Sequence, residues 1–202
     1  MKAKSWLKLG VGLAAFVPAG VIAYRFVTEQ LGANPIATAM NQLGLWTLIL
    51  LLCSLACTPL KLVFGWTWPL QVRKLLGLCA FAYVSLHFLV YLVLDQFFAW
   101  DEIWKDIAKR KFITVGFAAF LLLIPLAITS PKGMVKRLGY ARWKRIHRLV
   151  YAAATLGVIH FIWRVKVIGR EQLIYAGILA VLLGVRVVFA LRATSDTRPR
   201  SA

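Results

Sequence analysis

All three histidines of the chain lie in or beside strongly apolar segments. His87 is in SLHFLVYLVL, and His147 and His160 are both in WKRIHRLVYAAATLGVIHFIW. An imidazole in such a segment can bind a metal, carry a proton or form a hydrogen bond to a neighbouring helix. The positions of the three residues along their segments bear on which of these chemistries applies.

His87 and His160 are predicted to lie at the same depth of two separate helices. His87 is 13 residues after Lys74, and His160 is 12 residues after Arg148, the basic residues near the starts of these segments. With a rise of about 1.5 Å per residue, two such helices bring both imidazoles to one level. Two neutral imidazoles at one level can bind the two faces of a b-type haem iron. The alternative is a helix-to-helix hydrogen bond or a proton relay.

His147 precedes His160 by 13 residues in the same segment. This separation is about 20 Å along a helix axis, which suits two haems stacked across a bilayer. The two rings would however point about 140° apart around the helix, and no further histidine is available as a partner. A haem at His147 therefore needs a non-histidine second ligand, an open position or a distorted helix. The alternative is an interfacial residue that binds lipid phosphate.

Arg186 is a single cation inside the last apolar segment. Its long side chain could extend to the membrane surface. A guanidinium can also bind the propionate of a haem or the phosphate of a flavin, so Arg186 is a candidate cofactor-binding residue.

The composition indicates a membrane protein. Of 202 residues, 61% are hydrophobic and 16% are charged, and the formal net charge is +18. This charge does not indicate a nucleic-acid partner, because the apolar residues form blocks of about 20, long enough to cross a bilayer. The blocks predict an all-α, six-helix membrane bundle with short loops, a single transmembrane domain and no clear internal repeat. The predicted spans are 6–27, 43–64, 74–97, 112–129, 146–164 and 172–191.

The charges between the spans predict that both termini are cytoplasmic. With this orientation the inner segments, which include Arg198 and Arg200, hold about twice as many Lys and Arg as the outer ones. The basic loop 132–148 is expected to contact anionic lipid. In the outer loop 98–111, Trp100, Ile103, Trp104 and Ile107 recur with helical period. We expect an amphipathic helix there, which either docks a partner protein or lies on the membrane.

Three stretches carry a resemblance to a known family. They are NPIATAMNQLGLWTLILLLCSLACTPLKL, RKLLGLCAFAYVSLHFLVYLVLD and WKRIHRLVYAAATLGVIHFIW. From about residue 30 to residue 192 the chain resembles the haem-binding membrane subunits of the bacterial periplasmic methionine-sulfoxide reductase system, the MsrQ (YedZ) family. That family is part of the ferric-reductase-like transmembrane group.

The resemblance implies a bacterial inner-membrane protein that carries haem b and FMN. It implies electron transfer from the quinone pool, or from a cytoplasmic flavin reductase, to a periplasmic molybdopterin-containing catalytic subunit. The family's histidines correspond to His87, His147 and His160, but three histidines rather than four leave the number of haems open. The chain is too small for a nicotinamide domain and offers no soluble catalytic cleft, so we expect substrate chemistry on the partner.

Two other functions are compatible with intramembrane histidines. One is a transporter that uses them as metal or proton sites, and the other is a non-catalytic membrane scaffold. Transporters often contain repeats with paired broken helices, which are not evident here. A haem absorption spectrum of the purified protein separates the haem hypothesis from these two.

Overall fold

Six helical segments of the described residues are long and apolar enough to cross a membrane. The computed structural model describes residues 2–195, with side chains for residues 6–194, and contains no strand in that range. Arg198 and Arg200 lie outside it. The segments are α1 (Lys2–Val27), α2 (Pro35–Phe64), α3 (Arg73–Leu89) with its continuation η2 (Val90–Asp95), α5 (Lys111–Ile128), α7 (Tyr140–His147) with α8 (Leu149–Trp163), and α9 (Arg170–Ser195). The predicted all-α membrane bundle with six spans is confirmed.

Two helix boundaries differ from the predicted spans. α2 begins at Pro35 rather than at residue 43, because the Asn34 side chain accepts a hydrogen bond from the Ala37 N–H and Pro35 occupies the first turn. It ends at Gly65, whose φ of 73° is left-handed. The fifth span, predicted over 146–164, is divided near Arg148, so that the long α8 begins only at Leu149.

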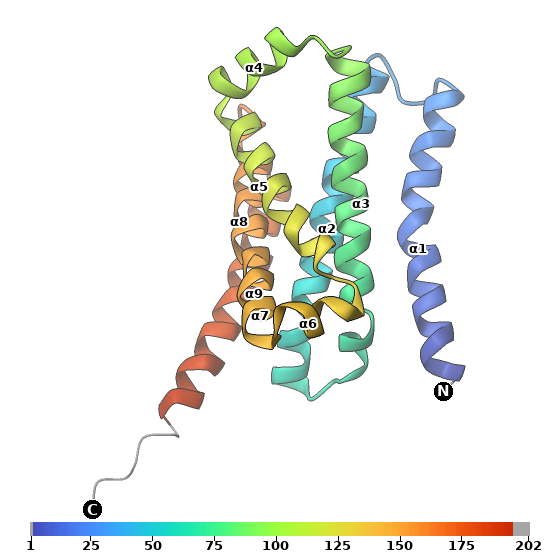
Figure 1. Ribbon diagram of the computed structural model, residues 1–202. Coiled ribbons are helices and arrows are strands. Elements are labelled where there is room, and N and C mark those ends of the chain that lie inside the picture. The colour runs from blue at the N-terminus through green and yellow to red at the C-terminus, as the bar shows by residue number, and fades with distance from the viewer. Residues whose placement is uncertain (1, 196–202) are drawn as a thin grey trace, which may run out of the picture.

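α2 is the central helix and packs against α1, α3, α8 and α9. The most extensive contacts are between α2 and α3 and between α5 and α8, and Figure 1 shows both pairs side by side. At the centre, leucines of α2 pack on small residues that let the backbones approach closely. The core includes Leu48, Leu51 and Leu55 of α2, Ala80 and Tyr83 of α3, and Ala153, Ala154 and Val158 of α8.

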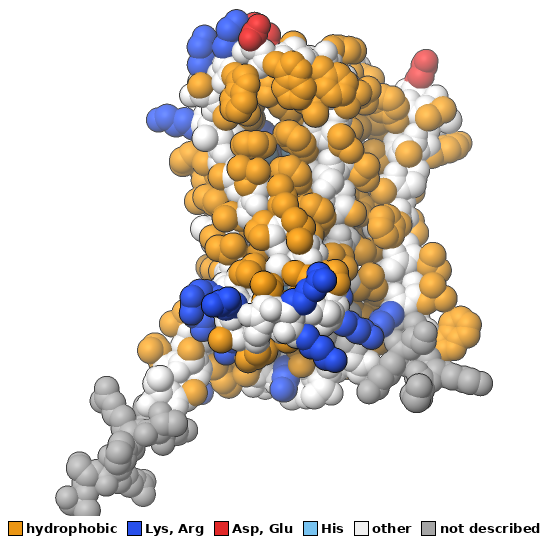
Figure 2. Space-filling model, viewed as in Figure 1, with side chains coloured by type: hydrophobic (Ala, Val, Ile, Leu, Met, Phe, Trp, Pro, Cys, Tyr) orange, Lys and Arg blue, Asp and Glu red, His pale blue; other side chains and the backbone are white. Residues whose placement is uncertain are grey.

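The two ends of the bundle differ. The short helix α4 (Trp100–Lys109) crosses one end, and α6 (Lys132–Leu138), α7, η1 (Trp68–Gln71) and both ends of the described chain lie at the other (Figure 1). We call these the α4 end and the terminal end. Figure 2 shows hydrophobic side chains over the middle of the bundle, with Lys and Arg near α6 and α7 at one end and both Lys or Arg and Asp or Glu near α4 at the other.

α4 is the helix expected in the loop 98–111. Its Ile103 is buried, whereas Trp100 and Trp104 are exposed. Before it, the third span ends in the π-helix η2, in which the Gln96 N–H bonds the Tyr91 carbonyl. Such wide turns are frequent at functional sites. Here the wide turn places Tyr91 and Asp95 in the wall of a cavity inside the bundle, at its α4 end.

Candidate cofactor site

α3 and α8 bring His87 and His160 together inside the bundle. Their ring centres are 6.2 Å apart, and the ring planes are nearly perpendicular, at 81°. An imidazole nitrogen lies about 2 Å from a metal that it ligates, so two rings on opposite sides of one metal have centres about 6 Å apart. The observed separation therefore suits two imidazoles that share a single metal ion.

Backbone carbonyls orient both imidazoles. Nδ1 of His87 lies 2.8 Å from the Met40 carbonyl oxygen, and Nδ1 of His160 lies 2.7 Å from the Phe112 carbonyl oxygen. A carbonyl can only accept, so each Nδ1 must carry the proton and donate it. In a neutral imidazole this leaves Nε2 unprotonated and able to bind a metal. A carbonyl that accepts the second ring N–H of each histidine is the usual arrangement around metal-binding histidines.

Two glycines make room for the imidazoles. Gly44 lies one turn after Met40 on α2, and a Cβ built on it would be 3.2 Å from His87 Nδ1. Gly116 lies one turn after Phe112 on α5, and a Cβ there would be only 2.5 Å from His160 Nδ1. A side chain at Gly116 would collide with His160, and one at Gly44 would force His87 to shift by a few tenths of an ångström. The carbonyl, the glycine and the histidine thus form one unit, which occurs twice.

The two histidines line a cavity of about 210 Å³ between the α2–α3 and α5–α8 pairs. Its wall is mostly apolar and aromatic, with Val84, Phe88, Phe117, Phe120, Leu123 and Phe161 among its residues. The charged side chains of the wall are Asp95, Arg110 and Arg164, which all come from the α4 end. Such a cavity suits a flat apolar molecule that carries polar groups on one edge.

The two imidazole nitrogens of His87 and His160 suit a metal that is already bound in a macrocycle. Among the described residues there is no group of three or more His, Cys, Asp or Glu side chains that could hold a bare ion. Two opposed imidazoles are sufficient for an iron whose other positions are filled by a porphyrin. The site therefore fits a haem better than the ion site of a metal transporter.

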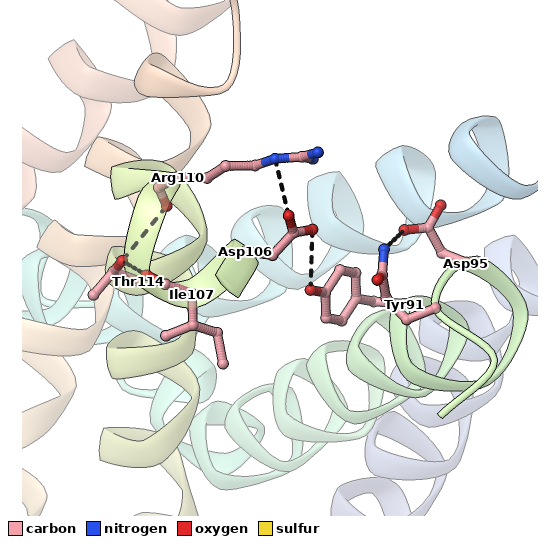
Figure 3. Close-up of polar contacts among 7 residues, drawn as sticks. Tyr91, Asp95, Asp106, Ile107, Arg110 and Thr114 are labelled. Atoms are coloured by element: carbon pink, nitrogen blue, oxygen red, sulfur yellow. Dashed lines mark hydrogen bonds and ion pairs between the residues drawn. The ribbon is translucent and has the colours of Figure 1, made fainter. Parts of the chain in front are cut away.

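Polar contacts tie α4 to the rim of this cavity (Figure 3). The Tyr91 hydroxyl donates to Oδ2 of Asp106 at 3.4 Å, and Nε of Arg110 lies 3.2 Å from Oδ1 of the same carboxylate. The Thr114 hydroxyl bonds the carbonyls of Ile107 and Arg110 beside them. Asp106 thus links the π-helix η2 to the start of α5.

His147 lies apart from this pair, at the terminal end. Its Nε2 is 3.1 Å from the Thr129 hydroxyl, and its ring centre is 4.2 Å from that of Trp143. The Thr129 hydroxyl already donates to the Pro125 carbonyl at 2.6 Å, so it must accept from His147. Nε2 of His147 therefore carries a proton in this conformation, and in the neutral ring Nδ1 is the free nitrogen.

Arg186 turns into the bundle rather than toward the membrane surface. Its guanidinium donates to the Tyr151 hydroxyl at 3.0 Å and to the Leu55 carbonyl, and it stacks near the Tyr151 ring. Its Nε is buried without a hydrogen-bond partner. With Arg73, Lys74 and His147 it lines a second cavity of about 340 Å³. This cavity is cationic and suits an anionic group.

Several of these features could not be expected from the histidine spacing. Met40 and Phe112 act through backbone oxygens, so their side chains give no signal. Gly44 and Gly116 do carry a signal, because each is a glycine within an apolar helix. Arg164 follows His160 by one turn and could have been identified in the same way as Arg186.

Comparison with known proteins places the chain in a family. Residues 43–158 match the ferric reductase like transmembrane component. Many curated relatives are named protein-methionine-sulfoxide reductase heme-binding subunit MsrQ. The one from Rhodospirillum rubrum is 54% identical over 96% of this chain and 93% of its own length. Those from Herminiimonas arsenicoxydans and Azospira oryzae are 49% and 46% identical, over 92% and 98% of this chain and 90% and 85% of their own lengths.

The three relatives align with 92–98% of this chain, which is more than the three stretches that carry the resemblance. Together with the six apolar helices, they identify a multi-pass membrane protein. The chain belongs to the MsrQ family and contains its ferric-reductase-like transmembrane component.

Proposed function

We propose that the chain is a membrane electron-transfer subunit that holds one haem b between His87 and His160. The observation that carries this proposal is the pair of Nδ1–carbonyl contacts, at 2.8 and 2.7 Å, which leave both Nε2 atoms free on rings whose centres are 6.2 Å apart. The names of the relatives describe heme-binding subunits and support the same cofactor. A haem iron would supply one-electron chemistry at this place. The protein would hold it, orient its ligands and exclude water.

The second cavity is proposed to hold FMN. Arg73, Lys74 and Arg186 offer cations for a phosphate, and Trp143 and Tyr151 offer aromatic surface for a flavin ring. Ligation of another haem iron by His147 Nε2 would require loss of its hydrogen bond to Thr129. The structure therefore favours His147 as part of the wall of the flavin cavity, and its assignment as a metal ligand stays a prediction.

In the proposed orientation the protein lies in the bacterial inner membrane with both termini in the cytoplasm. Electrons would come from the quinone pool or a cytoplasmic flavin reductase and enter at the terminal end. They would leave at the α4 end toward a periplasmic, molybdopterin-containing methionine-sulfoxide reductase catalytic subunit. The Lys and Arg near α6 and α7 support this orientation, and the names of the relatives support a methionine-sulfoxide reductase partner.

The test is spectroscopic. The wild-type protein, purified in detergent, is expected to show a Soret band and sharp bands of a low-spin haem after reduction. His87→Ala and His160→Ala should each remove the same haem, because each removes one of the two imidazoles that would hold it. His147→Ala is the matched control and should retain it. A colourless wild-type protein that is folded, or unchanged spectra in both single variants, contradicts the proposal.

A further inference from the structure

Arg164 is a half-buried cation at the rim of the cavity that His87 and His160 line. It follows His160 by four residues on α8, and its backbone N–H bonds the His160 carbonyl at 3.1 Å. Its guanidinium forms no hydrogen bond or ion pair with any residue that the structure describes. Its one ring contact is with Phe161, at 5.7 Å from the ring centre. Burial lowers the pKa of Arg164, while nearby Glu171 raises it.

The other charged groups of the cavity wall already have partners. Arg110 is paired with Asp106 at 3.2 Å, and Asp95 accepts a hydrogen bond from Gln96 at 2.8 Å. The rest of the wall is largely apolar. An anionic group on a ligand of this cavity would therefore find its best counter-ion at Arg164, because a buried charge needs a paired and hydrogen-bonded partner.

We propose that Arg164 binds the carboxylates of the haem, so that the propionate edge points to the α4 end. This inference rests on the proposed function, since it concerns the same cavity and cofactor. Protohaem carries its propionates on one edge, and the cavity offers its cations at one end only. Arg164 would thus fix how the macrocycle is rotated between His87 and His160, which do not themselves distinguish one edge from another.

Binding of two porphyrins to the full-length apoprotein in detergent tests this role. One is protohaem, and the other is protohaem dimethyl ester, which has the same iron and ring but no free carboxylate. Wild type is expected to bind protohaem more tightly than the ester. Arg164→Gln should weaken protohaem binding about tenfold or more, as expected for loss of a charge-assisted hydrogen bond, and leave ester binding unchanged. Arg164→Lys should be intermediate, because lysine keeps the charge but not the fork of donors.

Arg170→Gln is the matched control, since Arg170 is an exposed cation at the same end that does not line the cavity. It should bind both porphyrins as wild type does. If Arg164→Gln weakens both porphyrins equally, its role is structural and the inference is wrong. If it weakens neither while His87→Ala abolishes both, the inference fails and the proposed function stands. If wild type binds neither porphyrin, the proposed function itself fails.

Discussion

A Cβ atom on Gly116 would lie 2.5 Å from Nδ1 of His160, closer than a carbon and a nitrogen can approach. The Gly116→Ala change should therefore displace the imidazole and break its hydrogen bond to Phe112. Overpacking of this kind costs about 1–3 kcal/mol. We expect Gly116→Ala to lose most of its haem, measured as Soret absorbance per protein, and to unfold at a lower temperature.

Gly44 and Gly157 line the same cavity as Gly116, and their alanine variants serve as comparisons. Gly44→Ala, with its Cβ 3.2 Å from His87, should give a smaller loss, because the ring can shift by a few tenths of an ångström. Gly157→Ala meets only Leu48, at 3.9 Å, and should retain full haem content. Equal loss in all three variants would show that close approach to the histidines is not the cause.

The fold and the pairing of His87 with His160 could be predicted because both depend on side chains. Span length follows from apolar runs, and a common depth follows from counting residues from Lys74 and Arg148. The groups that orient the two histidines are backbone carbonyls, which the sequence does not reveal. The Met40 carbonyl lies 47 residues before His87 and the Phe112 carbonyl lies 48 residues before His160, each with a glycine one turn later. The two units show no repeat in the sequence, because the residues that supply the equivalent backbone oxygens, Met40 and Phe112, have different side chains.

For Arg186 the sequence left two alternatives open, extension to the membrane surface and cofactor binding. Its position in the last span allowed extension to the membrane surface, which depends on what its neighbours offer. The structure instead provides the Tyr151 hydroxyl and the Leu55 carbonyl as acceptors inside the bundle. These acceptors come from α8 and α2, far from Arg186 in the sequence. Spacing within one helix could not reveal them.

The Arg186→Met variant tests the flavin assignment of the second cavity. It removes the cation that would bind a phosphate but keeps much of the apolar volume. We expect flavin content to fall severalfold, measured by fluorescence of the released flavin, while the haem spectrum is unchanged. Arg145→Gln, which removes an exposed cation outside the cavity, should keep its flavin. Flavin retained in Arg186→Met would place it elsewhere.

The Thr129→Val variant tests whether His147 is structural. It removes the hydroxyl that accepts from His147 Nε2 but keeps the Thr129 carbonyl, which accepts from Trp143 at 3.0 Å. Loss of one such bond should cost about 1 kcal/mol and lower the thermal unfolding midpoint. The haem at His87 and His160 should keep its reduced spectrum. A change in that spectrum would mean that His147 contributes to the same iron centre.

The hydroxyl of Tyr83 occupies a break in the hydrogen bonds of α1. It donates to the Ala15 carbonyl at 2.7 Å and accepts from the Ala19 N–H at 2.9 Å, two groups that would otherwise bond each other. Tyr83 is fully buried on α3, and Pro18 and Gly20 flank the break. The hydroxyl therefore fastens α1 to the bundle at a point where the helix is locally weakened.

The Tyr83→Phe change should loosen this attachment without disturbing the cofactor. It leaves the Ala15 carbonyl and the Ala19 N–H without a partner, at a cost of about 1–3 kcal/mol if the helix cannot close its own bond. Hydrogen exchange at the Ala19 amide should accelerate strongly, with the amides of α5 and α8 unaffected and the haem content unchanged. Tyr24→Phe, an exposed tyrosine of the same helix, should exchange as wild type does. Unchanged protection at Ala19 would mean that α1 restores its own hydrogen bond and that other contacts hold it in place.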